Sequence, residues 1–398
     1  MLEAPLGDGR VVARPGDRRL VLLDPAAAAL WDLHASGMAV EALAGLVAER
    51  FGLAVAAAEA QVGSLVDGWR RAGLLDDGSE ASREWRSGPV ELVPRLPEPV
   101  AAPAPAGAWC LSLAELSVSL EVDSTEVEGG LASLLAPLLA PLLAPLRDGG
   151  GSEVLHRLAL RGGPERWTLE GNGDPLASGT DADGAVVATL RTLTELGCRG
   201  GERLLVVHGA GLVLPDGRGL LLVAPGGSGK TTLAAALNAD GLGLLGDDVI
   251  PVTPDGRLVG LGLPLCIKPG SFPVLASRRP DLGRASTVMR LGQPVRFLPP
   301  CGPRVAHPVT PALRLFPSYR PGEAPRVEPL SPAQVLRGVV EAEAVIRDLT
   351  QAKLEALALW AEAGPAYSVS YPDLETGLEI VEGLRKGRIP TLPPSAPV

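Results

Sequence analysis

The residues best suited to chemistry in this chain lie at 224–233, in the stretch APGGSGKTTL. Closely spaced glycines let successive backbone N–H groups turn toward phosphate oxygens, and a helix that begins directly after them adds its positive end. Lys230 would supply a charge to the β- and γ-phosphates of a nucleotide, and Thr231 would supply a hydroxyl to Mg²⁺. The spacing is that of a P-loop with Ala224 in the first position. It predicts that ATP and Mg²⁺ are bound by Gly226, Gly227, Ser228, Gly229, Lys230, Thr231 and Thr232.

Three more polar residues could complete a phosphoryl-transfer site. Asp247 and Asp248 follow a short apolar stretch downstream of the P-loop. One carboxylate could accept the proton of an attacking hydroxyl, while the other supports the metal ion together with Thr231. His208 precedes the P-loop by two short predicted strands, so a hairpin would return it to the phosphates, but a single histidine fits a structural role equally well. The predicted catalytic residues are Asp247, Asp248, His208 and Lys230.

Apolar patterning predicts the elements that would position these side chains. Residues 217–224 are typical of a buried strand, and residues 231–240 are typical of a helix. Alternating segments at 116–122 and 156–162 indicate further strands of a mixed sheet, and a strand at 367–371 precedes a final helix. The expected fold class is α/β, with the P-loop between a strand and a helix.

The first 75 residues have the pattern of a separate small domain. Two short apolar segments predict strands, and Asp24 followed by Pro25 is typical of a helix start. Two more helical patterns follow, so residues 1–75 predict a winged-helix-like α+β domain. Residues 76–108 are polar and then rich in proline and alanine, which is typical of a linker. Residues 109–398 are the predicted nucleotide-binding domain.

The charge balance argues against nucleic acid and anionic membranes as partners. The chain has 398 residues and a formal net charge of −10, and residues 1–77 hold seven Arg, no Lys and eleven acidic residues. A winged helix of this composition lacks the cations that contact DNA phosphates. The apolar stretch 129–146 contains Pro137, Pro141 and Pro145, so we expect a partly buried helix there and no membrane span. Four scattered cysteines and an N-terminus without a secretory pattern predict a cytoplasmic protein.

Residues 21–52, VLLDPAAAALWDLHASGMAVEALAGLVAERFG, and residues 62–75, VGSLVDGWRRAGLL, resemble the PqqD-like family. Members of this family are recognition elements that bind the leader peptides of ribosomally made, post-translationally modified peptides. The resemblance implies that a leader adds as a strand to a sheet edge and packs on the third helix. The implied peptide-binding residues are Leu20, Val21, Leu22, Val62, Leu65, Val66 and Trp69. A place in the core is the alternative for these apolar side chains.

A second resemblance covers about residues 110–385. The order of three motifs is similar to that of HPr kinase/phosphorylase, whose fold is related to phosphoenolpyruvate carboxykinase; the motifs are His208-Gly209, Gly229-Lys230-Thr231 and Asp247-Asp248. Residues 263–275, LPLCIKPGSFPVL, and 315–336, LFPSYRPGEAPRVEPLSPAQVL, look like the HPr-kinase-related proteins found beside peptide-modifying gene sets. The resemblance implies a P-loop kinase core with a mixed sheet of this type.

The same resemblance implies roles for the polar residues and a homo-oligomer. Asp247 would act as base toward a serine or threonine hydroxyl, Asp248 would support the metal ion or the base, and His208 would contact the transferred phosphoryl group. Two features depart from HPr kinases. Thr231-Thr232 stands where they carry Ser-Glu, and their Arg- and Gly-rich segment after the aspartate pair is not recognisable. Both departures argue against reverse phosphorolysis and against HPr itself as the substrate.

Together the two resemblances predict an ATP-dependent Ser/Thr kinase of a ribosomally made precursor peptide. The N-terminal domain would bind the leader, and the linker would set the reach of the captured substrate. Other peptide-modifying enzymes are further expected partners. Two alternatives stay open, because the acceptor pocket has no readable motif. One is a nucleotide-switched, non-catalytic peptide adaptor, and the other is a kinase of a small hydroxy metabolite.

Overall fold

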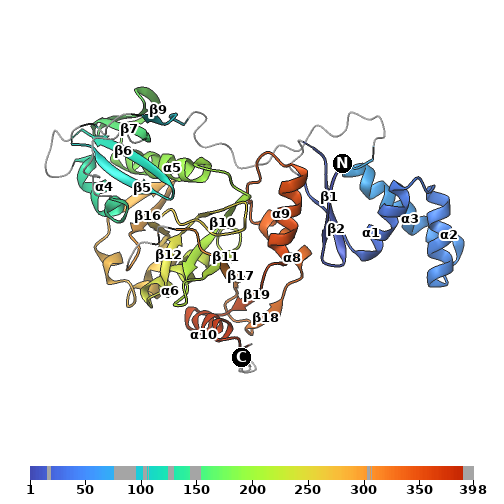
Figure 1. Cartoon of the computed structure of the whole chain (residues 1–398). Coiled ribbons are helices and arrows are strands. Elements are labelled where there is room, and N and C mark those ends of the chain that lie inside the picture. Colours follow the sequence, from blue (N-terminus) through green and yellow to red (C-terminus); the bar gives the residue numbers. More distant parts are fainter. Residues whose placement is uncertain are drawn as a thin grey trace. The chain divides into compact units, whose positions relative to one another are not determined.

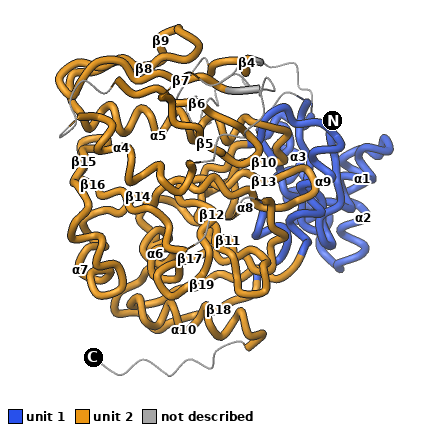
Figure 2. Tube along the Cα trace, turned by 60° about the vertical axis from the view of Figure 1, so that its left-hand side comes forward, with its two compact units in different colours: residues 1–88, 330–337, 346–363 blue, residues 89–329, 338–345, 364–398 orange. Residues whose placement is uncertain are grey.

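The computed structural model describes residues 1–15, 19–75, 96–101, 105, 107–123, 130–143, 154–302, 305 and 307–388. These residues form mixed α/β structure with several sheets and ten α-helices (Figure 1). Contacts divide the chain into two compact units (Figure 2). The first comprises 1–88, 330–337 and 346–363, and the second comprises 89–329, 338–345 and 364–398. Much of the expected linker lies outside the described residues, so its boundaries stay a prediction.

The first unit begins with a three-stranded antiparallel meander. Its strands are β1 (Leu2–Leu6), β2 (Gly9–Ala13) and β3 (Val21–Leu23), and its helices are α1 (Pro25–Ala35), α2 (Val40–Phe51) and α3 (Val55–Arg71). The Asp24 carboxylate caps α1 by accepting a hydrogen bond from the Ala27 N–H at 2.8 Å, and Pro25 occupies the first turn. The three helices match the predicted arrangement.

Two helices from late in the chain contribute to this first unit. They are α9 (Gln351–Glu362) and the first part of α8 (Pro332–Glu341). Gln351 accepts a hydrogen bond from the Glu3 N–H at 3.1 Å and donates one to the Glu3 carbonyl at 2.6 Å. Glu362 accepts a hydrogen bond from the Gly7 N–H at 2.7 Å. Side chains of α9 therefore cover the outer edge of β1.

The second unit contains a sheet that precedes the P-loop in sequence. Its order is β5 (Trp109–Leu113), β6 (Leu116–Val122), β7 (Val154–Gly163), β8 (Arg166–Gly171) and β9 (Asp174–Gly179), with β4 (Val100–Ala101) paired to β7. The helices α4 (Leu131–Leu139) and α5 (Ala182–Arg199) pack against its leucine-rich core. Within the stretch 129–146, α4 includes Pro137 and ends at Leu139, and Leu131 and Leu135 are buried. No helix among the described residues is long and apolar enough to cross a membrane.

The central sheet of the second unit carries the P-loop. Its order is β12 (Gly243–Gly246), β10 (Leu205–Val213), β11 (Gly219–Val223), β17 (Pro311–Tyr319), β19 (Ala366–Tyr371) and β18 (Arg326–Pro329), and β13 (Val249–Val252) also pairs with β10. β11, β17 and β19 run parallel, whereas β10 is antiparallel to β11. All five residues of β11 are buried, as its apolar run predicts. The helices α6 (Lys230–Ala239) and α10 (Leu374–Arg385) share a core with this sheet.

A small antiparallel sheet completes the surroundings of the P-loop. Its order is β14 (Leu265–Ile267), β16 (Gln293–Leu298) and β15 (Thr287–Arg290), and the short helix α7 (Phe272–Leu275) follows β14. The chain returns from β15 to β16 through Leu291, with φ of 51°, and Gly292. This hairpin carries Arg290 at the end of its first strand, next to the turn.

Candidate functional site

The predicted strand, loop and helix of the P-loop are confirmed. β11 ends at Val223, residues 224–229 form the loop, and α6 begins at Lys230. Gly229 has φ of 89°, and a Cβ added there would lie 2.9 Å from the Tyr371 Oη atom. This position therefore strongly favours glycine, for conformational and for steric reasons. The loop is followed directly by a helix N-terminus, an arrangement that binds phosphates.

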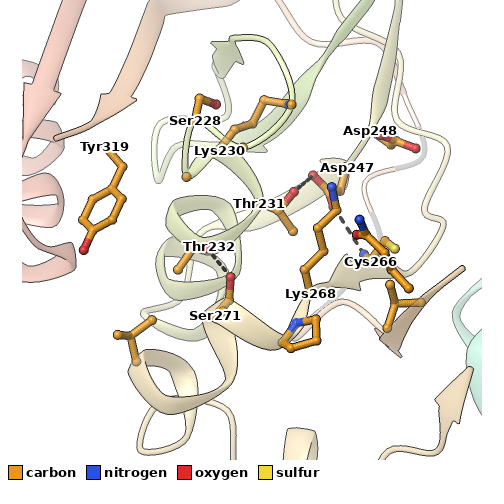
Figure 3. A pocket seen from close by; sticks show the side chains of 18 of the residues that line it. Ser228, Lys230, Thr231, Thr232, Asp247, Asp248, Cys266, Lys268, Ser271 and Tyr319 are labelled. Carbon is orange, nitrogen blue, oxygen red and sulfur yellow. Dashed lines mark hydrogen bonds between the residues drawn. The ribbon is translucent and has the colours of Figure 1, made fainter. Parts of the chain in front are cut away.

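The predicted polar residues meet beside this loop (Figure 3). The hydroxyl of Thr231 donates a hydrogen bond to Oδ1 of Asp247 at 3.0 Å, and Oδ2 of Asp247 accepts one from the Cys266 N–H at 3.3 Å. The Lys230 Nζ atom lies 3.5 Å from Nε2 of His208. The antiparallel strand β10 thus returns His208 to the P-loop, as the sequence predicts.

Asp248 faces different partners from its neighbour Asp247. Its Oδ2 atom accepts a hydrogen bond from Arg290 at 2.8 Å, and its Oδ1 atom lies 3.5 Å from Nε2 of His208. The backbone of Asp248 has φ of 75°, a left-handed conformation that is uncommon outside glycine and often found at functional sites. The sequence predicted Asp248 as the carboxylate that joins Thr231 at the metal ion, but the structure places Asp247 against Thr231.

The surroundings of the two carboxylates move their pKa values in opposite directions. Burial raises the pKa of Asp247 to about 6, and the negative charge of Asp248 adds to this increase. The hydrogen bond to His208 and the charge of Arg290 hold the pKa of Asp248 well below its ordinary value. Burial lowers the pKa of Lys230, whose side chain lies among these groups. Adjacent acids with separated pKa values are a common feature of catalytic sites.

These side chains line one cavity of about 810 Å³. It contains the P-loop, His208, both aspartates and Lys268. Several further residues that no sequence motif predicts also line the cavity: Cys266, Ser271, Arg290, Tyr319, Tyr371 and Asp373. Ser271 exchanges a hydrogen bond with Thr232 at 2.6 Å between their hydroxyl oxygens. Arg290 belongs to no motif; it lies at the end of β15 and donates a hydrogen bond to Asp248, 42 positions earlier in the chain.

The residues predicted to bind a peptide fall into two groups. Val21 and Leu22 are half-buried in β3, which ends its sheet and pairs with no other described strand besides β2, while Leu20 precedes the strand. Leu65 of α3 is also half-buried. The remaining three, Val62, Val66 and Trp69, are at most 2% exposed and pack in the core of the unit. Burial favours the core alternative for these three side chains, and their role as peptide contacts stays a prediction.

A comparison with known families identifies much of this first unit. Residues 9–75 match the family described as Coenzyme PQQ synthesis protein D (PqqD). Residues 9–75 form a PqqD-like domain. The match begins at β2 and runs through the end of α3 to residue 75, so it includes the β3 edge but not the P-loop. No curated protein matches the chain.

Proposed function

We propose that this protein is an ATP-dependent kinase that phosphorylates a serine or threonine hydroxyl of a precursor peptide held by its PqqD-like domain. The observation that carries the proposal is the meeting of Lys230, Thr231, His208 and the two aspartates around one P-loop cavity. These are the parts that phosphoryl transfer requires: phosphate-binding groups, a place for a metal ion, and a carboxylate for the acceptor proton.

Mg²⁺ fits the donor atoms beside the P-loop. The Thr231 hydroxyl and the Asp247 carboxylate are 3.0 Å apart, and hydroxyl and carboxylate oxygens are ligands that Mg²⁺ prefers. Thr231 would hold the ion, and the neighbouring Asp248 would support it with its negative charge, which leaves Asp247 free for the acceptor proton. When bound, it would neutralise charge on the phosphate oxygens. Lys230 supplies a second positive charge at the same place.

Asp247 is the proposed base because of where its carboxylate lies. It contacts Thr231 at the phosphate end of the cavity, whereas both oxygens of Asp248 face Arg290 and His208. The acceptor hydroxyl oxygen forms a bond to the γ-phosphorus, the bond from that phosphorus to the β–γ bridging oxygen breaks, and ADP leaves. Asp247 takes the hydroxyl proton. Asp248 stays ionised and orients His208 and Arg290.

The PqqD-like domain supports a peptide as the acceptor. PqqD-type recognition elements act by strand addition, and β3 presents an edge that no other described strand covers. A captured leader would raise the local concentration of the acceptor residue at the cavity. The HPr-kinase-like core of the second unit is part of this proposal, supported by the order and the geometry of the motifs.

Intact mass spectrometry of a candidate precursor peptide tests the proposal. We expect the peptide to gain the mass of one phosphoryl group when incubated with the full chain, ATP and Mg²⁺. Lys230→Ala is the matched control, since it removes the charge at the phosphates and should abolish the gain. A peptide that binds the chain but never gains this mass would instead favour a nucleotide-switched adaptor.

A further inference from the structure

The cavity extends past the P-loop on the side away from the acidic pair. In the central sheet, β10 and β12 lie on one side of β11, and β17 and β19 lie on the other. Because β11, β17 and β19 are parallel, their carboxyl ends meet at one edge, where α/β sheets bind ligands. β17 and β19 end at Tyr319 and Tyr371, and both residues line the cavity. The chain has only three tyrosines, so two of them gather here.

Both tyrosines contact the phosphate-binding loop. The Tyr319 N–H donates a hydrogen bond to the Ser228 carbonyl at 3.0 Å, which joins the end of β17 to the loop. The two tyrosine rings are 6.2 Å apart between centroids. Tyr319 is 47% exposed and Tyr371 is 3% exposed, so Tyr371 backs a ring that Tyr319 presents to solvent. In Figure 3, Tyr319 lies across the P-loop from Asp247 and Asp248.

In the part of the chain that the structure describes, the hydroxyl group of Tyr371 lies unpaired beside the loop. It is buried and has no hydrogen-bond partner among the described residues. Its oxygen lies 2.9 Å from the place of a Cβ at Gly229, directly against the loop. Buried polar groups are normally paired, so this hydroxyl keeps a free hydrogen-bonding capacity beside the loop proposed to bind phosphates.

We propose that Tyr319 and Tyr371 form a nucleobase subsite, in which the base of a nucleoside triphosphate stacks on the exposed face of Tyr319. This inference rests on the proposed nucleotide binding. The triphosphate then runs from the tyrosines across the P-loop toward Lys230, which leaves the γ-phosphate beside Asp247. Every nucleobase has a face that can stack on an aromatic ring. Tyr319 should therefore strengthen binding of a nucleotide relative to inorganic triphosphate. It should discriminate little between adenine and guanine.

Calorimetry on the full chain tests the subsite with two probes, ATP and inorganic triphosphate, each with Mg²⁺. We expect Tyr319→Ala to weaken ATP binding about tenfold, since stacking is lost. Binding of inorganic triphosphate should change less than about twofold, because the Lys230 and Thr231 contacts remain. Tyr319→Phe is the matched control and should bind ATP as the parent does, because it keeps the ring. Tyr319 is half exposed, and circular dichroism checks that both variants are folded.

The outcomes separate this inference from the function on which it rests. Equal ATP affinity of the parent and Tyr319→Ala would overturn the subsite while leaving the P-loop site intact. If Tyr319→Ala lost affinity equally for ATP and for inorganic triphosphate, the subsite would also be overturned. Tyr319 would then act on the conformation of the P-loop and not on the base. The proposed nucleotide site itself fails if the parent binds neither ATP nor inorganic triphosphate. It also fails if Lys230→Ala binds both probes as tightly as the parent does.

Discussion

At the scale of single residues, the side chains around Asp247 and Asp248 give these two adjacent aspartates different pKa values. Asp247 is buried against Thr231 and the Cys266 N–H, whereas Asp248 has the cation of Arg290 at 2.8 Å. One carboxylate thereby lies beside the first turn of α6, where the phosphates are proposed to bind, and the other is kept ionised by its partners. The two side chains are chemically identical, so only their surroundings can divide the roles of base and charge support between them.

Replacement of each aspartate by asparagine tests this division of roles. We expect Asp247→Asn to lower phosphoryl transfer roughly 10²- to 10⁴-fold while ATP binding persists, because an amide cannot take the acceptor proton. Transfer rates and nucleotide affinities, measured on the same preparations, check this result. Asp255→Asn is a matched control, since Asp255 is exposed and lies outside the cavity. If Asp248→Asn shows the pure transfer defect and Asp247→Asn does not, the two roles are reversed.

Arg290, which no sequence motif predicts, contacts Asp248 and is proposed here as a positioning residue. We expect Arg290→Gln to lower the transfer rate about tenfold or more, since a charge-assisted hydrogen bond to Asp248 is lost. Arg290→Lys should restore part of the rate, and Arg284→Gln, an exposed arginine outside the cavity, should leave it unchanged. Steady-state kinetics with saturating peptide measure the effect. A parent-like rate for Arg290→Gln would exclude this role.

At the scale of elements, the sequence predicts those strands, helices and caps that depend on residues close together in the chain. The apolar run before the P-loop, the helix after it and the Asp24 cap are all confirmed, because each depends on residues a few positions apart. Contacts between distant segments were not predictable in this way. Gln351 forms a hydrogen bond with the backbone of Glu3, which lies 348 positions earlier in the chain. Arg290 of the β15–β16 hairpin contacts Asp248 only in the folded structure, because 42 positions separate the two residues. The apolar face of α3 also fits a core and a peptide groove equally well in sequence.

The edge strand β3 gives a prediction at this scale. Neighbouring backbone N–H groups point to opposite sides of a strand, so one of Val21→Pro and Leu22→Pro removes an outward N–H and the other removes one that pairs with β2. We expect the first kind of variant to stay folded and lose peptide affinity, and the second to destabilise the sheet. Fluorescence anisotropy with labelled leader peptide, together with circular dichroism, measures both effects.

The opposite edge of the same sheet supplies the control. Gln351→Ala removes two hydrogen bonds from the edge of β1 that α9 covers, so peptide affinity should not change. A loss of affinity in Gln351→Ala with parent-like binding by both proline variants would place the peptide at β1 and not at β3.

At the scale of the whole molecule, the chain combines a PqqD-like domain with the cavity proposed as a reaction site. In the proposed function, the PqqD-like domain supplies peptide binding and the P-loop cavity supplies the chemistry. Tethering offers a physical reason for the combination, because a captured leader converts the encounter of acceptor and cavity into an intramolecular step. The advantage should be largest at peptide concentrations well below saturation.

The most direct test of the central claim is the transfer of label from γ-labelled ATP to a full-length precursor and to its leaderless form, at equal low concentration. We expect the parent chain to label the full-length precursor many times faster than the leaderless form. We also expect the folded β3 proline variant to label both substrates equally slowly, and Lys230→Ala to label neither. Equal labelling of the two substrates by the parent, or label found only on a small hydroxy metabolite, would contradict the central claim.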